Sequence, residues 1–265
     1  MLPLAFLSGG LLLAGLALAP PERRGETLGA LEALPFQVSD TLFTRPPAPL
    51  RPGDVALDAI SAGDLMARLE LADVDWQPQA EVLPDGGVRY RYRRREGDPK
   101  LSIEQIRALL VDPPRFEQER QAISHLLDQL QRVGVQVVLG PPRKAGAAGE
   151  WDPAARTIRI KPEVVDQGSA TFALVLNHEA IHVAQSCRRG GVSAPPKQLG
   201  LSISATPQAQ GQLNDPIYAN LSPLERQLEQ EAYAHQDQLE KGAALISQEC
   251  RPPAGLLGGR TAARP

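Results

Sequence analysis

The chain has 265 residues, a formal net charge of -3 and 42% hydrophobic residues. It is therefore long and apolar enough to bury the core of one sizeable domain, with room for a smaller appendage. A slightly acidic balance gives no electrostatic reason to bind nucleic acid, so we expect no nucleic-acid partner. The 25 prolines and 23 glycines indicate long irregular connections between modest elements.

The segment 1–19, MLPLAFLSGGLLLAGLALA, contains no charged side chain. A run of this kind is either a signal peptide or an N-terminal membrane anchor. The sequence around Ala19 is similar to a signal-peptidase site, but Pro20 directly after it would hinder cleavage. Both alternatives stay open, and in either case we expect the rest of the chain to be secreted, periplasmic or membrane-anchored outside the cytoplasm.

Residues 20–98 are rich in proline, and we expect an irregular N-terminal region with some β-structure. A short helix is predicted within 59–74. The turn Asp85-Gly86-Gly87 separates two runs that have the character of strands. The second run, RYRYRRR, alternates arginine with tyrosine, but such a run in an acidic protein is more often a solvated face than a nucleic-acid site.

Residues 99–250 show regular patterns and are predicted to form the main domain, followed by a disordered tail over 251–265. Ser102, with Gln105 three residues later, is typical of a capping box at a helix start. A second amphipathic helix ends near Gly134.

Two strands are predicted after these helices. VQVVLG, 135–140, is rich in β-branched residues, and a loop with glycine and proline follows it. TIRI, 157–160, alternates apolar and polar residues, which indicates a strand with one buried face.

The segment LVLNHEAIHVAQSC lies in a predicted helix over roughly 169–187. His178 and His182 are four residues apart, so they project from one face of the helix, one turn apart. Neutral imidazole binds zinc at about 2.0–2.1 Å, and two such donors leave positions for a third ligand and a water molecule. The spacing therefore predicts a site for one Zn2+ ion.

Glu179 lies about 100 degrees round the helix from His178, too far to be a ligand of the same ion. It is close enough to contact a water molecule on the metal, which makes it the predicted general base. The alternative interpretation is a pair of hydrogen-bonded histidines in a protein core, with no metal.

LNHEAIHVAQ, following TIRI, resembles the active-site helix of zincin metallopeptidases, in which an edge strand pairs with extended substrate. The resemblance covers roughly residues 100–250. It implies an α+β fold in which the active-site helix packs beside a small sheet. No HxxGxxH continuation follows and no methionine lies after Met66, so the sequence is unlike metzincins and closer to gluzincins.

In gluzincins the third metal ligand is a glutamate on a downstream helix, and LERQLEQEAYAHQ offers Glu229 and Glu231. Glu229 fits the family pattern, with Tyr233 in the position of its aspartate. On a helical wheel of the predicted last helix, however, Glu231 lies on the apolar stripe and would therefore point inward. The two are about 200 degrees apart, so they cannot both bind one ion. We favour Glu229, with Glu231 as the alternative; ordinary surface charges at both positions are the third option.

A peptidase also needs a group that stabilises the charge developing on the substrate carbonyl. Tyr218, Tyr233 and His235 are candidates for this role. Asn177 and Gln185 are candidates for orienting the ligand histidines.

The two cysteines, Cys187 and Cys250, can form a disulfide in an oxidising compartment. That bond would tie the end of the motif helix to the end of the last predicted helix. Two unpaired buried thiols are the alternative.

A segment of about thirty residues, 188–220, separates the motif helix from a last helix that begins with Ser222 as N-cap. We expect this segment to run past the active-site cleft. The leading hypothesis is an exported or membrane-anchored zinc peptidase acting on a peptide or protein. The alternative is a non-catalytic zincin-like binding or structural module of the cell envelope.

Overall fold

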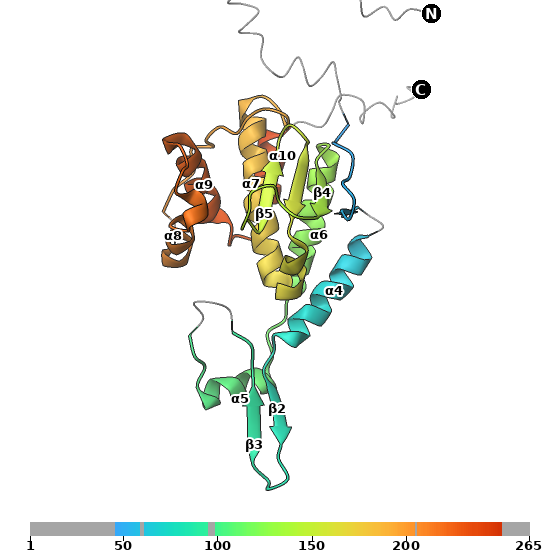
Figure 1. Cartoon of the computed structure of the whole chain (residues 1–265), viewed down its shortest axis with the longest axis vertical. Coiled ribbons are helices and arrows are strands. Elements are labelled where there is room, and N and C mark those ends of the chain that lie inside the picture. The colour runs from blue at the N-terminus through green and yellow to red at the C-terminus, as the bar shows by residue number, and fades with distance from the viewer. Residues whose placement is uncertain (1–45, 59–60, 95–98, 205, 251–265) are drawn as a thin grey trace, which may run out of the picture.

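The computed structural model describes residues 46–58, 61–94, 99–204 and 206–250 (Figure 1). The predicted signal peptide or anchor over 1–19 and the predicted tail over 251–265 lie outside the described residues. Within the described part of the chain, no helix is long and apolar enough to cross a membrane.

A four-stranded sheet lies at the centre of the protein, in the order β1-β4-β6-β5. Its strands are β1 (Val55–Ala56), β4 (Gln136–Leu139), β5 (Gly149–Asp152) and β6 (Thr157–Ile160). The two inner strands, β4 and β6, are parallel, while β1 and β5 run antiparallel to their neighbours. The protein thus has the predicted α+β character with a small sheet.

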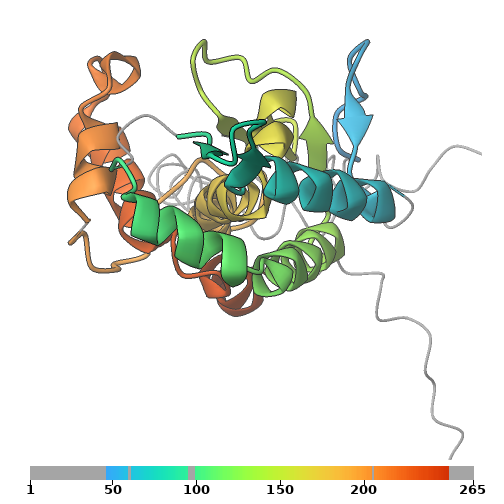
Figure 2. The same cartoon turned by 90° about the horizontal axis from the view of Figure 1, so that it is seen from below.

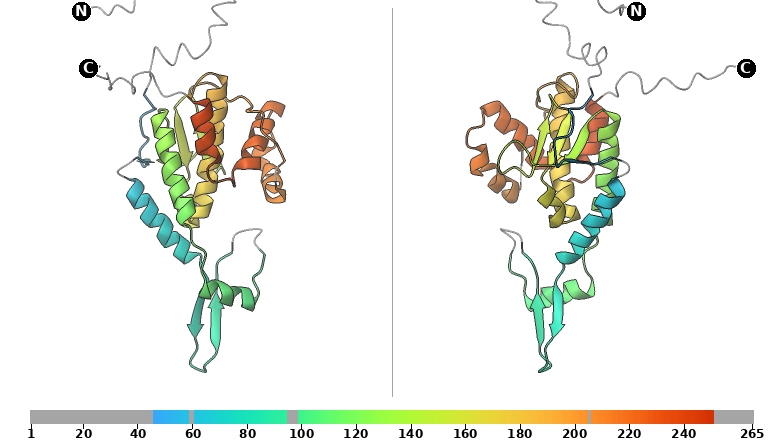
Figure 3. Two further views of the ribbon diagram at one scale, coloured as in Figure 1. Left: turned by 180° about the vertical axis from the view of Figure 1, so that it is seen from behind. Right: turned by 45° about the vertical axis from the view of Figure 1, so that its right-hand side comes forward.

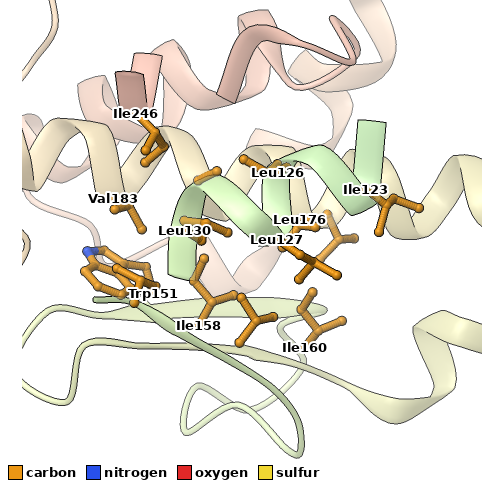
Figure 4. Close-up of a cluster of buried hydrophobic side chains, with 14 of the residues drawn as sticks. Ile123, Leu126, Leu127, Leu130, Trp151, Ile158, Ile160, Leu176, Val183 and Ile246 are labelled. Atoms are coloured by element: carbon orange, nitrogen blue, oxygen red, sulfur yellow. The ribbon is translucent and has the colours of Figure 1, made fainter. Parts of the chain in front are cut away.

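The helices α6 (Glu117–Arg132) and α7 (Ser169–Arg189) cover one face of this sheet, and α10 (Lys241–Glu249) packs against these two helices (Figure 3). Their apolar side chains meet those of the strands in one core (Figure 4). Burial of this much apolar surface is what holds α7 against the sheet. Members of the core include Ile123, Leu126, Leu130, Trp151, Ile158, Ile160, Leu176, Val183 and Ile246.

The strand β6 differs from its prediction in two respects. It lies between β4 and β5 rather than at an edge, and all four of its residues are buried. The alternation is present, with Ile158 and Ile160 in the core, but the polar face is covered as well. Arg159 is buried there because both of its terminal nitrogens lie 2.8 Å from the carboxylate oxygens of Asp54.

The sheet ends at β5 on the side of β6. This edge strand falls in the stretch that the sequence predicts to be a loop. Its four residues, GEWD, contain a single large apolar side chain, Trp151. A strand this short gives no periodic pattern, and its pairing with β6 is what defines it.

The packing does not follow the boundary predicted at residue 98. β1 pairs with β4, and α4 (Ala62–Asp75) contributes Leu65 and Leu69 to the common core. Both elements precede residue 98 yet belong to the same layer structure as the main domain.

A small arm projects from this body (Figure 1) and is seen end on in Figure 2. It consists of the hairpin β2 (Gln79–Val82) and β3 (Val88–Arg91), together with α5 (Ile103–Val111). The predicted turn at 85–87 is confirmed, and so is the capping box of Ser102. Arg89 and Arg91 are exposed and pair with Glu81, as expected for a solvated face.

The segment 188–220 contains two helical pieces, α8 (Pro207–Leu213) and a 3-10 turn, η2 (Pro216–Tyr218). After it, α9 (Pro223–His235) begins with the predicted cap at Ser222, and α10 is a separate helix. Cys187 at the end of α7 is joined to Cys250 after α10 by a disulfide. These connections place α9 beside α7, and α8 packs against α9 (Figure 1).

The N-terminus of α7 is held by a carboxylate from α4. Asp73 accepts hydrogen bonds from the backbone N–H and the hydroxyl of Ser169, each at 2.7 Å, and pairs with Arg120 at 2.6 Å. A carboxylate at this end also favours the helix dipole. Gly168, just before the helix, has φ +86° and ψ 176°, a conformation that is essentially restricted to glycine.

We predict that Gly168→Ala lowers the free energy of unfolding by about 2 kcal/mol or more. A Cβ atom there would lie 2.6 Å from Oδ1 of Asp73, in addition to the backbone strain. Urea denaturation measures the loss. Gly63→Ala in α4 is the matched control, because a Cβ there meets nothing within 4 Å. Equal stability of the two variants would contradict the role assigned to Gly168.

Candidate metal centre

Two histidines of α7 meet at their Nε2 atoms, which lie 3.2 Å apart. The one-turn spacing places both rings on the side of α7 that faces α9, and the rings meet edge to face. His178 is buried, and His182 is largely so. This is the arrangement that the spacing of the two residues predicts.

A carboxylate from α9 completes the group. Oε2 of Glu229 lies 3.2 Å from Nε2 of His178 and 3.6 Å from Nε2 of His182. The three side chains offer ligand atoms that all lie within 4.8 Å of one another. The structure thus brings Glu229, the favoured third ligand, to the two histidines, and the group could hold a metal ion.

Two glutamines determine which ring nitrogens carry hydrogen. Oε1 of Gln236 lies 3.0 Å from Nδ1 of His178, and Oε1 of Gln185 lies 2.7 Å from Nδ1 of His182. Because a carbonyl oxygen only accepts, each Nδ1 must be the donor. In a neutral imidazole the Nε2 atom then presents its lone pair to the centre.

Three electron-pair donors therefore face one another: the two Nε2 atoms and the carboxylate of Glu229. Such an arrangement is repulsive unless a proton or a metal cation lies between them. The spacing also suits a metal, since a tetrahedral ion with bonds of about 2.0–2.1 Å separates its ligands by about 3.3–3.4 Å. The measured separations of 3.2, 3.2 and 3.6 Å bracket that value.

The pKa values reflect this crowding in the metal-free protein. Burial alone would lower the pKa of His182, but the carboxylate of Glu229 outweighs it and, with smaller effects of Glu179 and Gln185, raises the pKa to about 9. Burial alone would raise the pKa of Glu229, yet His182 and His178 lower it far below its usual value. A shared proton between these groups is the competitor of a metal ion.

Glu179 points from α7 toward the edge strand β5. Its carboxylate is buried, which raises its pKa, while the two histidines and the backbone N–H of Trp151 oppose the rise. A Cβ atom at Gly149 would lie 2.7 Å from Oε1 of Glu179. Only glycine at that position allows the carboxylate to lie this close to the strand.

A cleft with two lobes crosses the site. Lobe A, about 210 Å³, and lobe B, about 300 Å³, share Gly149, His178, Glu179 and Tyr218 in their walls. The predicted passage of segment 188–220 along the cleft is confirmed, since Asp215 and Pro196 line the lobes. Ile217 also lines both lobes. Lobe A is further lined by Leu174, Val175 and Tyr233, and lobe B by Lys144, Glu150, Trp151, Leu221, Glu225 and Leu228.

The structure separates the three candidates for stabilising a transition state. Tyr218 and Tyr233 both line the cleft, with their hydroxyl oxygens 2.7 Å apart, and the Tyr233 ring packs against His178. His235 lies elsewhere, with Nε2 3.0 Å from the carbonyl oxygen of Ser202. It does not line either lobe, so the structure does not bring it to the site.

Glu231, the alternative ligand, is buried as the helical stripe predicts, but it faces a different neighbour. Its carboxylate accepts hydrogen bonds from three successive backbone N–H groups, at 199, 200 and 201. It also accepts one from Nε2 of Gln185, at 3.0 Å. These bonds keep Glu231 away from the histidines and fasten segment 188–220 to α9.

The two predicted orienting residues have different roles. Gln185 contacts His182, and its Nε2 donates to the carbonyl oxygen of Leu228, directly before Glu229. The hydrogen bonds of Asn177 go elsewhere: its Nδ2 donates to the carbonyl oxygens of Gln236 and Gln238 in the turn after α9, and its Oδ1 accepts from the N–H of Gly242 in α10.

The partner of His178, Gln236, was missed by sequence reasoning. One signal could have found it. Gln236 follows Glu229 by seven residues, which is two helical turns and hence the same face.

We predict that Gln185→Met weakens zinc binding about 10- to 100-fold. Methionine keeps the buried volume but removes the bonds to His182 and to the carbonyl before Glu229, so the ligands lose their fixed orientation. Competition with a chromophoric chelator measures the affinity. Gln131→Met, on the exposed side of α6, is the control and should bind zinc like the parent protein. Unchanged affinity of Gln185→Met would disprove the orienting role.

We further predict that zinc affinity rises with pH, roughly tenfold per unit, up to about pH 9. The raised pKa of His182 means that the metal-free protein holds this proton at pH 7, and zinc must displace it. Calorimetric titration at pH 7 in buffers of different ionisation enthalpy should show release of about one proton. Binding without proton release would show that His182 is already deprotonated.

No protein-family model, no curated protein and no solved structure matches this chain.

Proposed function

We propose that the chain is a zinc-dependent peptidase of the zincin kind, with a gluzincin-like ligand set, that hydrolyses peptide bonds in extended substrates. One observation carries the proposal: two imidazoles and a carboxylate converge on one point, with a second carboxylate beside them and an open cleft in front. His178, His182 and Glu229 would hold the ion. The combination of nitrogen and oxygen ligands on a fixed scaffold suits zinc.

A bound zinc ion supplies Lewis acidity, which activates water and polarises the carbonyl to be cleaved. Glu179 takes the proton from that water and passes it to the nitrogen of the leaving amine. Burial supports this second step, because it raises the pKa of Glu179 and so helps the carboxyl group to retain the proton until the amine needs it.

The edge strand β5 offers the backbone groups that an extended substrate needs. Lys161 donates to the carbonyl oxygen of Ala148, so hydrogen-bonded pairs alternate from that residue along the antiparallel ladder. The N–H and C=O of Gly149 therefore point away from β6, toward the cleft. β5 thus takes the substrate-pairing role that sequence reasoning had given to the segment TIRI.

Tyr218 and Tyr233 are the proposed donors to the developing oxyanion. Burial raises the pKa of Tyr233 to about 12 and also raises the pKa of Tyr218, so both hydroxyls stay protonated at neutral pH. Their mutual hydrogen bond holds the pair in the wall of the cleft.

The proposed location is outside the cytoplasm, either exported or anchored to a membrane. The disulfide between Cys187 and Cys250 supports it, because such bonds persist in oxidising compartments. The apolar segment 1–19 would provide the signal or the anchor.

We predict that Glu179→Gln retains one zinc ion per chain and lowers cleavage of an unfolded protein mixture by about 10²- to 10⁴-fold. Glutamine fills the same volume but cannot accept the proton. Zinc stoichiometry and the rate of peptide release are measured on the same preparation. Glu163→Gln, on the surface of η1, is the matched control and should cleave like the parent protein. Full activity of Glu179→Gln, or no activity in the parent protein, would reject the proposed function.

A further inference from the structure

Lobe A of the cleft combines apolar walls with two carboxylates, Glu179 beside the histidines and Asp215. Leu174 and Val175 of α7 and Ile217 of η2 provide the walls, and Asp215 is the carboxylate that the proposed catalytic step does not use. No lysine or arginine is present among the described residues that line this lobe. An apolar channel with an acidic end matches a side chain that carries a cation on an aliphatic stem.

Asp215 shares lobe A with no lysine or arginine among the described residues that line it. The two positive charges of a zinc ion would be balanced by Glu229 and Glu179, the carboxylates next to it. Lys144 lines lobe B, where its Nζ lies 4.3 Å from the centre of the Tyr218 ring. On that side, hydrogen bonds from Ser222 lower the pKa of Glu225, and Lys144 adds to the effect.

Asp215 is held in a defined position at the N-cap of η2. Its Oδ1 accepts the backbone N–H of Ile217 at 3.0 Å, and its own N–H donates to the carbonyl oxygen of Gln212. The carboxylate is near enough to the centre to contribute to the raised pKa of Tyr233, whose ring packs against His178. Asp215 is thus an exposed residue held in a fixed position in the wall of lobe A, which His178 also lines.

The direction of β5 identifies the substrate residue that enters lobe A. The strand begins at Gly149, which lines both lobes as Ala147 does; Glu150 and Trp151 after it line lobe B only, whereas Gly146 and Ala148 line lobe A only. A substrate paired antiparallel to β5, the more stable arrangement, places its N-terminal half in lobe B. Lobe A then receives the residue that follows the cleaved bond.

We infer that this chain, if it is the proposed peptidase, selects peptides with lysine or arginine directly after the cleaved bond, and that Asp215 determines this preference. The aliphatic stem packs on Leu174, Val175 and Ile217, and the cationic head reaches Asp215. A purely apolar residue would desolvate the carboxylate without pairing it, and an acidic residue would be repelled.

The test uses two peptides that differ only at that position, one with lysine and one with norleucine, which has a similar stem and no charge. We expect kcat/KM of the parent protein to favour lysine by about tenfold. In Asp215→Asn the preference should fall to about twofold or less, since asparagine keeps the cap of η2 and loses the charge. Asp128→Asn, in an exposed ion pair on α6, should keep the full preference.

Mapping of cleavage sites in an unfolded protein mixture gives a second readout. Lysine and arginine should be enriched directly after the cut with the parent protein, and the enrichment should disappear with Asp215→Asn. Cleavage without this enrichment, or an enrichment that survives Asp215→Asn, would overturn the role of Asp215 and leave the peptidase assignment intact. Absence of any cleavage by the zinc-loaded parent protein would overturn both.

Discussion

Three electron-pair donors that face one another set the central constraint of this protein. Two imidazoles from α7 and a carboxylate from α9 converge on one point. Without a proton or a metal ion between them the arrangement is costly, so the surrounding structure must hold the two helices in register. It does so mainly through Gln185 and Asn177 on α7, which bond the backbone of α9 and of the turn after it. The buried carboxylate of Glu231 also accepts hydrogen bonds from the backbone of segment 188–220 and so fixes that segment to α9.

The groups that orient the histidines are neutral amides rather than carboxylates. Gln185 and Gln236 accept hydrogen bonds from the Nδ1 atoms and so select the tautomer, but they add no negative charge. Of the three side chains that would bind an ion, His178, His182 and Glu229, only Glu229 carries a negative charge. In the proposed peptidase, less charge donation from the surroundings would leave the ion more Lewis acidity toward water and the substrate carbonyl. Apart from Glu179, the carboxylate that lines lobe A among the described residues is Asp215.

The two walls of the cleft, α7 on one side and η2 with its flanking segments on the other, are packed differently. α7 is buried along most of its length against the sheet, α6 and α10, and its first turn is held by Asp73. The far wall of the cleft comes from η2 and the segments around it, which pack less closely. A rigid helix with a more open opposite wall is the usual division between residues that do chemistry and residues that choose the substrate.

The sequence by itself determined what depends on local geometry. The spacing of His178 and His182 and the place of Glu179 follow from the pitch of one helix, and the capping boxes at Ser102 and Ser222 are equally local. Only the tertiary structure decided between Glu229 and Glu231, because the rotation of α9 relative to α7 cannot be read from α9 alone.

The same holds for the edge strand β5, for Gln236 and for Asp215 in the cleft. Each acquires its role from a partner that is distant in the chain. Contacts of that kind are set by how the helices and strands pack, and a single sequence carries no periodic signal for them.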